Sequence, residues 1–178
     1  MMRLWRRYVR RSGQRRRCPK PKRPSLPSRR NTRPGLADGQ LVRAVVDVNV
    51  LISGVLSAKG ASAEILRANR DGQLELVVSE LLLAELERTL AYPRLRKRIP
   101  PEKAAAFLNW VRHHGTMTED PISPPPVGSR DPDDDCLLAL AIDRRAYLVT
   151  GDQDLLVLND ELPILTTTQF ASKLRDTR

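Results

Sequence analysis

The stretch RAVVDVNVLI, residues 43–52, decides the fold of this chain. Its β-branched valines and nearly continuous apolar character predict a strand that is buried on both faces, as in a parallel sheet. Asp47 is costly in such a strand, because a buried carboxylate is kept only where a metal ion, a cation or hydrogen-bond donors compensate it. A simpler interpretation stays open beside this one, in which Asp47 and Asn49 cap the helix that follows.

Strand and helix patterns alternate along the rest of the chain. Further strands are predicted at 74–78, 146–150 and 164–165. A helical turn is predicted at 51–56 and a second short one after Asp152. Helices are predicted from 62 to a turn near 71–72, at 80–90, at 101–114, from 132 onward and at 166–174. Such alternation indicates the α/β class, with a mostly parallel sheet, helices on both faces and right-handed crossovers.

A run of acids opens the helix that begins near residue 132. Asp131 followed by Pro132 predicts a helix start with Asp131 as the N-cap. Acids in a first helical turn complement the helix dipole, which is the simplest explanation of this run. The sequence DPDDD at 131–135 holds four aspartates, however, and these repel one another unless a cation is bound.

The charge of the chain is unevenly distributed. The net charge is +10 over 178 residues, but residues 1–40 contain 14 Lys or Arg and one acid, so residues 41–178 carry a net charge of −3. Residues 1–41 are rich in Arg and Pro, and we expect them to form a disordered leader. Three interpretations of this leader compete: an upstream extension, a cationic arm that binds RNA or DNA, and a transit-like leader. We rank the extension first, because Val42, directly before the strand, is where a shorter natural chain would start.

Cysteine content and hydropathy exclude several classes of protein. The chain has two cysteines, Cys18 and Cys136, which argues against a disulfide scaffold or a structural zinc site and fits a reducing, cytoplasmic location. Because no apolar run reaches 18 residues, we expect no membrane span.

Acidic residues recur where strands end and helices begin. Asp47 and Asp152 lie at strand ends, Asp135 lies in the first turn of a helix, and Glu85 lies on the helix after the second strand. The helical pattern alone does not choose between Glu85 and Glu87. Because the ends of parallel strands share one edge of a sheet, these acids predict a site for Mg²⁺ or Mn²⁺. Such ions catalyse phosphodiester hydrolysis, which is the chemistry we expect.

Four segments together resemble the PIN-domain family, and in particular the PIN toxins of bacterial toxin-antitoxin systems. The segments are VDVNVLISG at 46–54, SELLLAEL at 79–86, RDPDDD at 130–135 with the following LALA, and LVTGDQDLL at 148–156. The resemblance covers residues 42–175 and implies a three-layer α/β/α domain with a central parallel sheet. It further implies a divalent-metal-dependent endoribonuclease that forms homodimers and is inhibited by a small cognate antitoxin.

The resemblance also implies roles for individual residues. Asp47 and Asp135 would be primary metal ligands, Glu85 would complete the first metal site, and Asp152 would bind a second metal or position the attacking water. Thr150 and Asn49 would orient these carboxylates, with Asp131 and Asp154 in support. The leader departs from the family pattern, which leaves the natural start of the protein open.

Three alternatives remain to be compared with this interpretation. A haloacid-dehalogenase-like phosphatase needs a second carboxylate two residues after the first, where this chain has Asn49, and a receiver domain needs a Lys that is missing between Lys103 and Lys173. The third alternative is a non-catalytic module that binds RNA or a partner, but acids without a catalytic role would repel one another in such a module.

Because residues 41–178 are acidic, we expect the phosphates of RNA to bind at local basic residues. We predict that these are Arg94, Arg96, Lys97 and Arg98.

Overall fold

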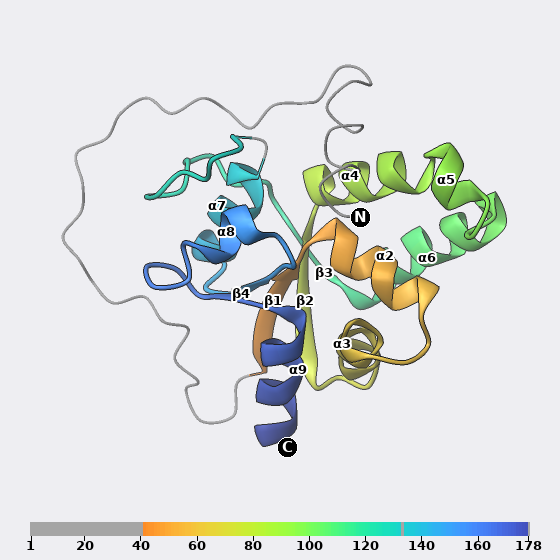
Figure 1. Cartoon of the computed structure of the whole chain (residues 1–178), viewed down its shortest axis with the longest axis horizontal. Coiled ribbons are helices and arrows are strands. Elements are labelled where there is room, and N and C mark those ends of the chain that lie inside the picture. Colours follow the sequence, from red (N-terminus) through yellow and green to blue (C-terminus); the bar gives the residue numbers. More distant parts are fainter. Residues whose placement is uncertain (1–40, 133, 178) are drawn as a thin grey trace.

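The computed structural model describes residues 41–132 and 134–177 and arranges them as a three-layer α/β/α fold (Figure 1). In this part of the chain, five parallel strands form one sheet in the spatial order β3-β2-β1-β4-β5. The strands are β1 (Val42–Val46), β2 (Leu74–Ser79), β3 (Thr116–Thr118), β4 (Tyr147–Val149) and β5 (Ile164–Leu165). The fold class expected from the alternating pattern is confirmed.

Eight helices connect and flank these strands within the described residues. They are α2 (Val48–Leu56), α3 (Ala61–Arg70), α4 (Glu80–Leu90), α5 (Pro93–Arg96), α6 (Pro101–His114), α7 (Asp135–Asp143), α8 (Gln153–Leu156) and α9 (Thr167–Asp176). Each of them is too short or too polar to span a lipid bilayer. The predicted leader lies outside the described residues except for Leu41, and the boundaries assigned to the leader and the domain stay predictions.

The first strand is shorter than the sequence predicts. We expected strand character in the run up to Ile52 and a helical turn from Leu51, but β1 ends at Val46 and α2 begins at Val48. Asp47 is the N-cap of α2, because its carboxylate accepts a hydrogen bond from the backbone N–H of Asn49. The valines after Asp47 are buried in a helix rather than in a strand, and an apolar run that is buried on all sides does not distinguish the two. The capping interpretation is thus correct for Asp47.

The start of α7 also differs from the prediction. We expected Asp131 to be its N-cap, whereas the helix begins at Asp135 with Asp134 in the cap position. The carbonyl of Asp131 instead accepts a hydrogen bond from the backbone N–H of Asp134, so that a separate turn precedes the helix. The acids of this run are therefore divided between a loop and a helix end.

The order of the strands defines one edge of the sheet as a place for a ligand. From β1 the chain adds β2 and then β3 on one side, and it later adds β4 and β5 on the other side. In open α/β sheets, ligands bind beyond the carboxyl ends of the strands where this direction reverses, which here lies between β1 and β4. Val46 and Val149 are paired at those ends, so Asp47 and Thr150 follow them directly.

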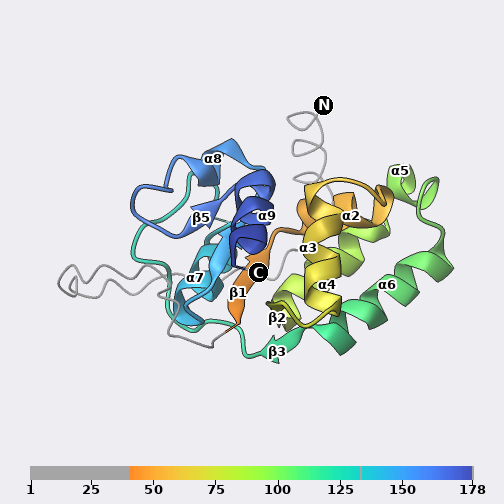
Figure 2. The same cartoon turned by 90° about the horizontal axis from the view of Figure 1, so that it is seen from below.

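Buried apolar side chains hold the helices on the sheet. Val45, Val46 and Val78 of the central strands are fully buried, as are Leu86 of α4 and Phe170 of α9. Helix α7 packs against β1 and β4, whereas α3 packs against α2, β2 and α9. In both views α7 and α8 lie on one side of β1, and α3, α4, α5 and α6 lie on the other (Figures 1 and 2).

Candidate active site

The centre of the candidate site is a buried pair formed by Asp47 and Thr150. Asp47 is 6% exposed and Thr150 is fully buried. The Thr150 hydroxyl donates a hydrogen bond of 2.7 Å to Oδ2 of Asp47, and the backbone N–H of Asn49 donates one of 2.9 Å to Oδ1. Within the described residues no Lys or Arg pairs with this carboxylate, so its charge is stabilised by neutral donors alone.

Asp152 and Asp154 continue from this pair into α8. The Thr150 oxygen accepts a hydrogen bond of 3.1 Å from the backbone N–H of Asp152. Oδ1 of Asp152 in turn accepts one of 3.0 Å from the backbone N–H of Asp154, which makes Asp152 the N-cap of α8. A chain of hydrogen bonds therefore runs from Asp47 at the end of β1 to the first turn of the helix after β4.

Asp135 is held by the loop that precedes α7. Its Oδ1 accepts hydrogen bonds from the backbone N–H of Ser129 at 2.7 Å and lies 2.9 Å from the Ser129 hydroxyl. The same hydroxyl lies against the carbonyl of Asp131. Ser129 was not singled out from the sequence; only its place directly before the RDPDDD segment marked it. The structure assigns it the task of orienting the Asp135 carboxylate.

Glu85 lies on α4 and forms contacts within that helix. Its carboxylate makes an ion pair with Arg88, and the Thr89 hydroxyl lies 3.4 Å from Oε1. The Glu85 side chain is 40% exposed. Glu87, the alternative that the helical pattern left open, is exposed on the same helix. Neither residue has a contact with Asp47, Asp135 or Asp152 among the hydrogen bonds and ion pairs of the described residues.

The donor atoms of these residues are all oxygens. Carboxylate and hydroxyl oxygens without His or Cys fit Mg²⁺ or Mn²⁺ by chemical type. In residues 41–132 and 134–177, however, no group of three or more His, Cys, Asp or Glu side chains is arranged so that it could hold a metal ion. The structure joins Asp47 to Asp152 through Thr150, while Glu85 and Asp135 are held by Arg88 and Ser129. Convergence of all four carboxylates on one ion stays a prediction.

The basic residues predicted to contact RNA form a separate group. Arg94 and Arg96 lie on α5, Lys97 is its C-cap and Arg98 follows, and all four are exposed. Helix α5 lies on the side of the molecule opposite α7 and α8 (Figures 1 and 2). This group therefore does not lie beside the Asp152–Asp154 segment.

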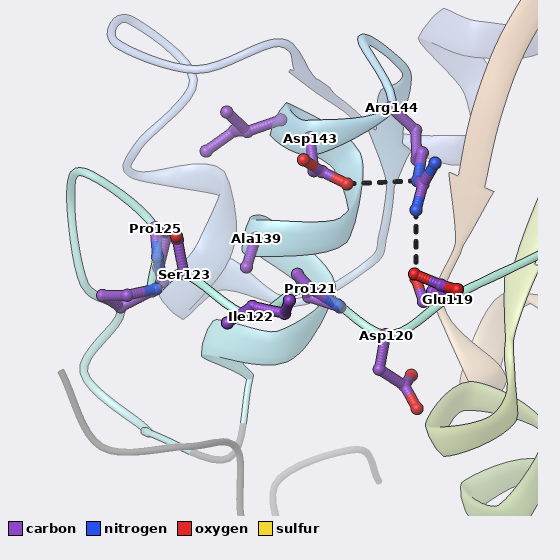
Figure 3. A pocket seen from close by; sticks show the side chains of 11 residues that line it. Glu119, Asp120, Pro121, Ile122, Ser123, Pro125, Ala139, Asp143 and Arg144 are labelled. Atoms are coloured by element: carbon purple, nitrogen blue, oxygen red, sulfur yellow. Dashed lines mark hydrogen bonds and ion pairs between the residues drawn. The ribbon is translucent and has the colours of Figure 1, made fainter.

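A hollow of about 350 Å³ lies between the 119–125 loop and α7 (Figure 3). Ion-pair and hydrogen-bond contacts of Arg144 with Asp143 and with the carbonyl of Glu119 border it. Asp120 also lines it and accepts a hydrogen bond from the backbone N–H of Leu81. None of the predicted metal ligands lines this hollow, so it is distinct from the candidate site.

Comparison with known protein families matches residues 43–154 to the PIN domain. This match covers more than half of the chain and includes all four of the predicted metal ligands. The chain belongs to the PIN-domain family. PIN domains are generally nucleases, and they typically use divalent metal ions.

This PIN domain also has a relative among curated proteins. It is 28% identical over 120 residues to Uncharacterized protein MJ1680 of Methanocaldococcus jannaschii, an alignment that covers 67% of this chain and 77% of the relative. The name of that protein assigns it no activity. The chain is therefore also similar to an individual curated protein, but this similarity indicates no substrate.

Proposed function

We propose that this protein is a divalent-metal-dependent endoribonuclease that hydrolyses RNA phosphodiester bonds. The observation that carries the proposal is the buried Asp47 carboxylate, which is hydrogen-bonded to Thr150 at the edge of the sheet between β1 and β4. A buried carboxylate that lacks a basic partner among the described residues is suited to a metal cation. Membership of a family that generally consists of nucleases supports the same conclusion.

In this proposal each acidic residue has a distinct role. Asp47 and Asp135 are the primary metal ligands, Glu85 completes the first metal site, and Asp152 binds a second ion or positions the attacking water. When bound, Mg²⁺ or Mn²⁺ supplies a Lewis acid that lowers the pKa of water and stabilises the charge on the phosphate oxygens. Thr150 and the backbone of Asn49 fix the Asp47 carboxylate, and Ser129 fixes that of Asp135. Asp131 and Asp154 are supporting residues.

The biological role that we propose is that of a toxin in a toxin-antitoxin pair. This includes a small cognate antitoxin protein, a homodimer and a cytoplasmic location. A neighbouring reading frame that encodes a small DNA-binding protein would support the pairing. Growth arrest on induced expression of the wild-type protein, but not of the Asp47→Asn variant, would support toxicity. If both tests fail, the toxin role is excluded, and the nuclease activity is decided by the cleavage assay alone.

The principal experiment is an RNA cleavage assay with transfer, ribosomal and messenger RNA. We expect the full chain to cleave RNA in the presence of Mg²⁺ or Mn²⁺ and cleavage to stop when EDTA removes the metal. The Asp47→Asn variant should be inactive. Asp143→Asn is the matched control, because Asp143 is an exposed aspartate at the far end of α7. Equal rates for Asp47→Asn and the wild-type chain would remove the enzyme assignment.

A non-catalytic RNA-binding or partner-binding module is the alternative function. The observation that favours it is that Asp47, Asp135 and Glu85 each have a protein partner, and that no group of three or more potential metal ligands is found among the described residues. This alternative predicts RNA binding that is independent of metal and no cleavage product. The same assay decides between the two functions, and a chain that lacks residues 1–41 tests in addition whether the leader contributes.

A further inference from the structure

We propose that Arg130 binds a phosphate group of the substrate beside the carboxylates of the candidate site. This inference rests on the proposed function, because it assigns a substrate contact to the same site. Arg130 belongs to the RDPDDD segment, but neither the helix-start pattern nor the metal-ligand pattern gives it a task. Its position follows from contacts on both sides of it.

The backbone next to Arg130 is tied to Asp135. Ser129, the preceding residue, directs both its backbone N–H and its hydroxyl toward Oδ1 of Asp135, at 2.7 and 2.9 Å. Two contacts to one oxygen restrict the loop at the point where Arg130 leaves it. The Cα of Arg130 is therefore fixed relative to a proposed metal ligand.

The side chain of Arg130 reaches the opposite element of the site. Its Nη1 lies 3.5 Å from Oδ1 of Asp154 in the first turn of α8. The backbone of Asp154 is bound to Asp152, and the backbone of Asp152 is bound to Thr150. The guanidinium therefore spans the space between the loop that holds Asp135 and the helix turn that Asp152 caps.

The pair that Arg130 forms with Asp154 is easily exchanged. The Arg130 side chain is 77% exposed and that of Asp154 is 44% exposed. Exposed ion pairs contribute little stability, because water screens both charges. Within the described residues, this contact uses one of the five N–H donors of the guanidinium. The remaining donors have the fork geometry that binds two phosphate oxygens at once.

The acidic charge of the domain favours a phosphate contact that includes a local basic side chain. Residues 41–178 carry a net charge of −3, and the candidate site itself is acidic, so an RNA phosphate that approaches it is repelled. The exposed bases at α5 lie on the opposite side of the molecule from α8 (Figures 1 and 2). Arg130 offers a positive charge on the side where the phosphate must bind.

The competing interpretation is that Arg130 serves only as an ion-pair partner of Asp154. The chain provides a matched control for this in Arg70 and Asp71, an exposed ion pair of 2.9 Å at the carboxyl end of α3, before β2 and near the amino end of that strand. Removal of either arginine changes the charge of the chain by the same amount. Only Arg130 lies beside the proposed phosphate position.

The test measures binding of a labelled single-stranded RNA oligonucleotide by the full chain with Asp47→Asn, in EDTA, so that no cleavage occurs. We expect Arg130→Ala to weaken binding about tenfold, Arg130→Lys to restore part of the affinity, and Arg70→Ala to have no effect. The slope of log affinity against log salt should fall by about 0.7, as for one lost phosphate contact with a single strand. Residues 1–40 are present in every variant, so a difference between Arg130→Ala and Arg70→Ala depends on the position of the lost charge alone.

An Asp154→Ala variant separates a phosphate contact from a structural ion pair. If Arg130 binds phosphate, Arg130→Ala weakens binding in the Asp154→Ala background as well. If Arg130→Ala, Asp154→Ala and the double variant bind equally, or if Arg130→Ala matches Arg70→Ala, the inference is overturned. If the wild-type chain cleaves RNA with metal but one of these two results is obtained, only the inference about Arg130 is overturned. If the chain neither cleaves nor binds RNA, the proposed function is overturned as well.

Discussion

Thr150 and Asp47 are separated by 103 positions in the sequence, yet the Thr150 hydroxyl donates a 2.7 Å hydrogen bond to Oδ2 of Asp47. The contact exists because Val46 and Val149 are paired on adjacent parallel strands. The residues that follow them, Asp47 and Thr150, therefore lie side by side at the carboxyl ends of these strands. One hydroxyl thereby stabilises a buried charge and sets the direction of the carboxylate.

We predict that Thr150→Val, which keeps the shape of the side chain, lowers the free energy of unfolding by about 1–3 kcal/mol, because it removes a donor from a buried carboxylate. Cleavage should fall about tenfold as the carboxylate loses its orientation. Urea denaturation and initial rates measure the two effects. Thr150→Ser keeps the hydroxyl and is the control; if Val and Ser variants behave alike, the hydrogen bond has no role.

The choice between Glu85 and Glu87 can be decided by a pair of matched substitutions. We predict that Glu85→Gln lowers the cleavage rate at least about tenfold and raises the Mg²⁺ concentration needed for half-maximal activity, because it removes a proposed metal ligand. Glu87→Gln on the same helix should leave both quantities unchanged. Titration of Mg²⁺ against initial rate provides the measurement. The reverse ranking would assign the metal to Glu87.

The contact of Ser129 with Asp135 gives a further prediction. Ser129→Ala retains the backbone N–H but removes the hydroxyl that lies 2.9 Å from Oδ1 of Asp135. We expect a loss of about tenfold in metal affinity, which is typical of residues that orient a ligand. Ser123→Ala, an exposed serine of the same connecting segment, is the control. Metal titration that gives the same midpoint for both variants would exclude this role for Ser129.

The exposed bases at α5 are tested by single charge reversals. We predict that Arg96→Glu, Lys97→Glu or Arg98→Glu weakens RNA binding and lowers the salt slope by about 0.7 for each lost phosphate contact. Lys59→Glu, in the exposed turn before α3, makes the same change of charge at a different place and should have a smaller effect. Affinities that match those of Lys59→Glu would move the RNA surface away from α5.

Much of the fold could be predicted, because its elements carry strong local signals. The helix expected at 80–90 is α4, and it begins directly after Ser79, whose hydroxyl accepts a hydrogen bond from the backbone N–H of Leu82. The helix expected between Pro101 and Gly115 and the closing helix after Thr166 are both present. Strand β3 and helix α5 were missed, because segments of three and four residues with largely exposed side chains have no hydrophobic period to detect.

The errors lie where tertiary contacts override local preference. The run after Asp47 has the composition of a strand, but Asp47 acts as an N-cap and the run forms a helix that buries Val48, Val50, Leu51 and Ile52. The helix start at Pro132 was wrong because Ser129 and the carbonyl of Asp131 form a turn that the Asp-Pro pattern does not encode. For the site, the sequence indicated which acids lie at strand ends. It did not indicate that the Thr150 hydroxyl links Asp47 to Asp152, because that contact depends on the register of β1 and β4.

The central position of β1 has a consequence for the protein during its synthesis. Strands β1 and β2 come from neighbouring parts of the chain, but β4, on the other flank of β1, is translated about a hundred residues later. Until the ribosome has released that segment, the first strand has an open hydrogen-bonding edge and the aspartate at its end has no threonine partner. A nascent polypeptide therefore completes this edge of the sheet, and the Asp47–Thr150 pair, only after β4 has left the ribosome.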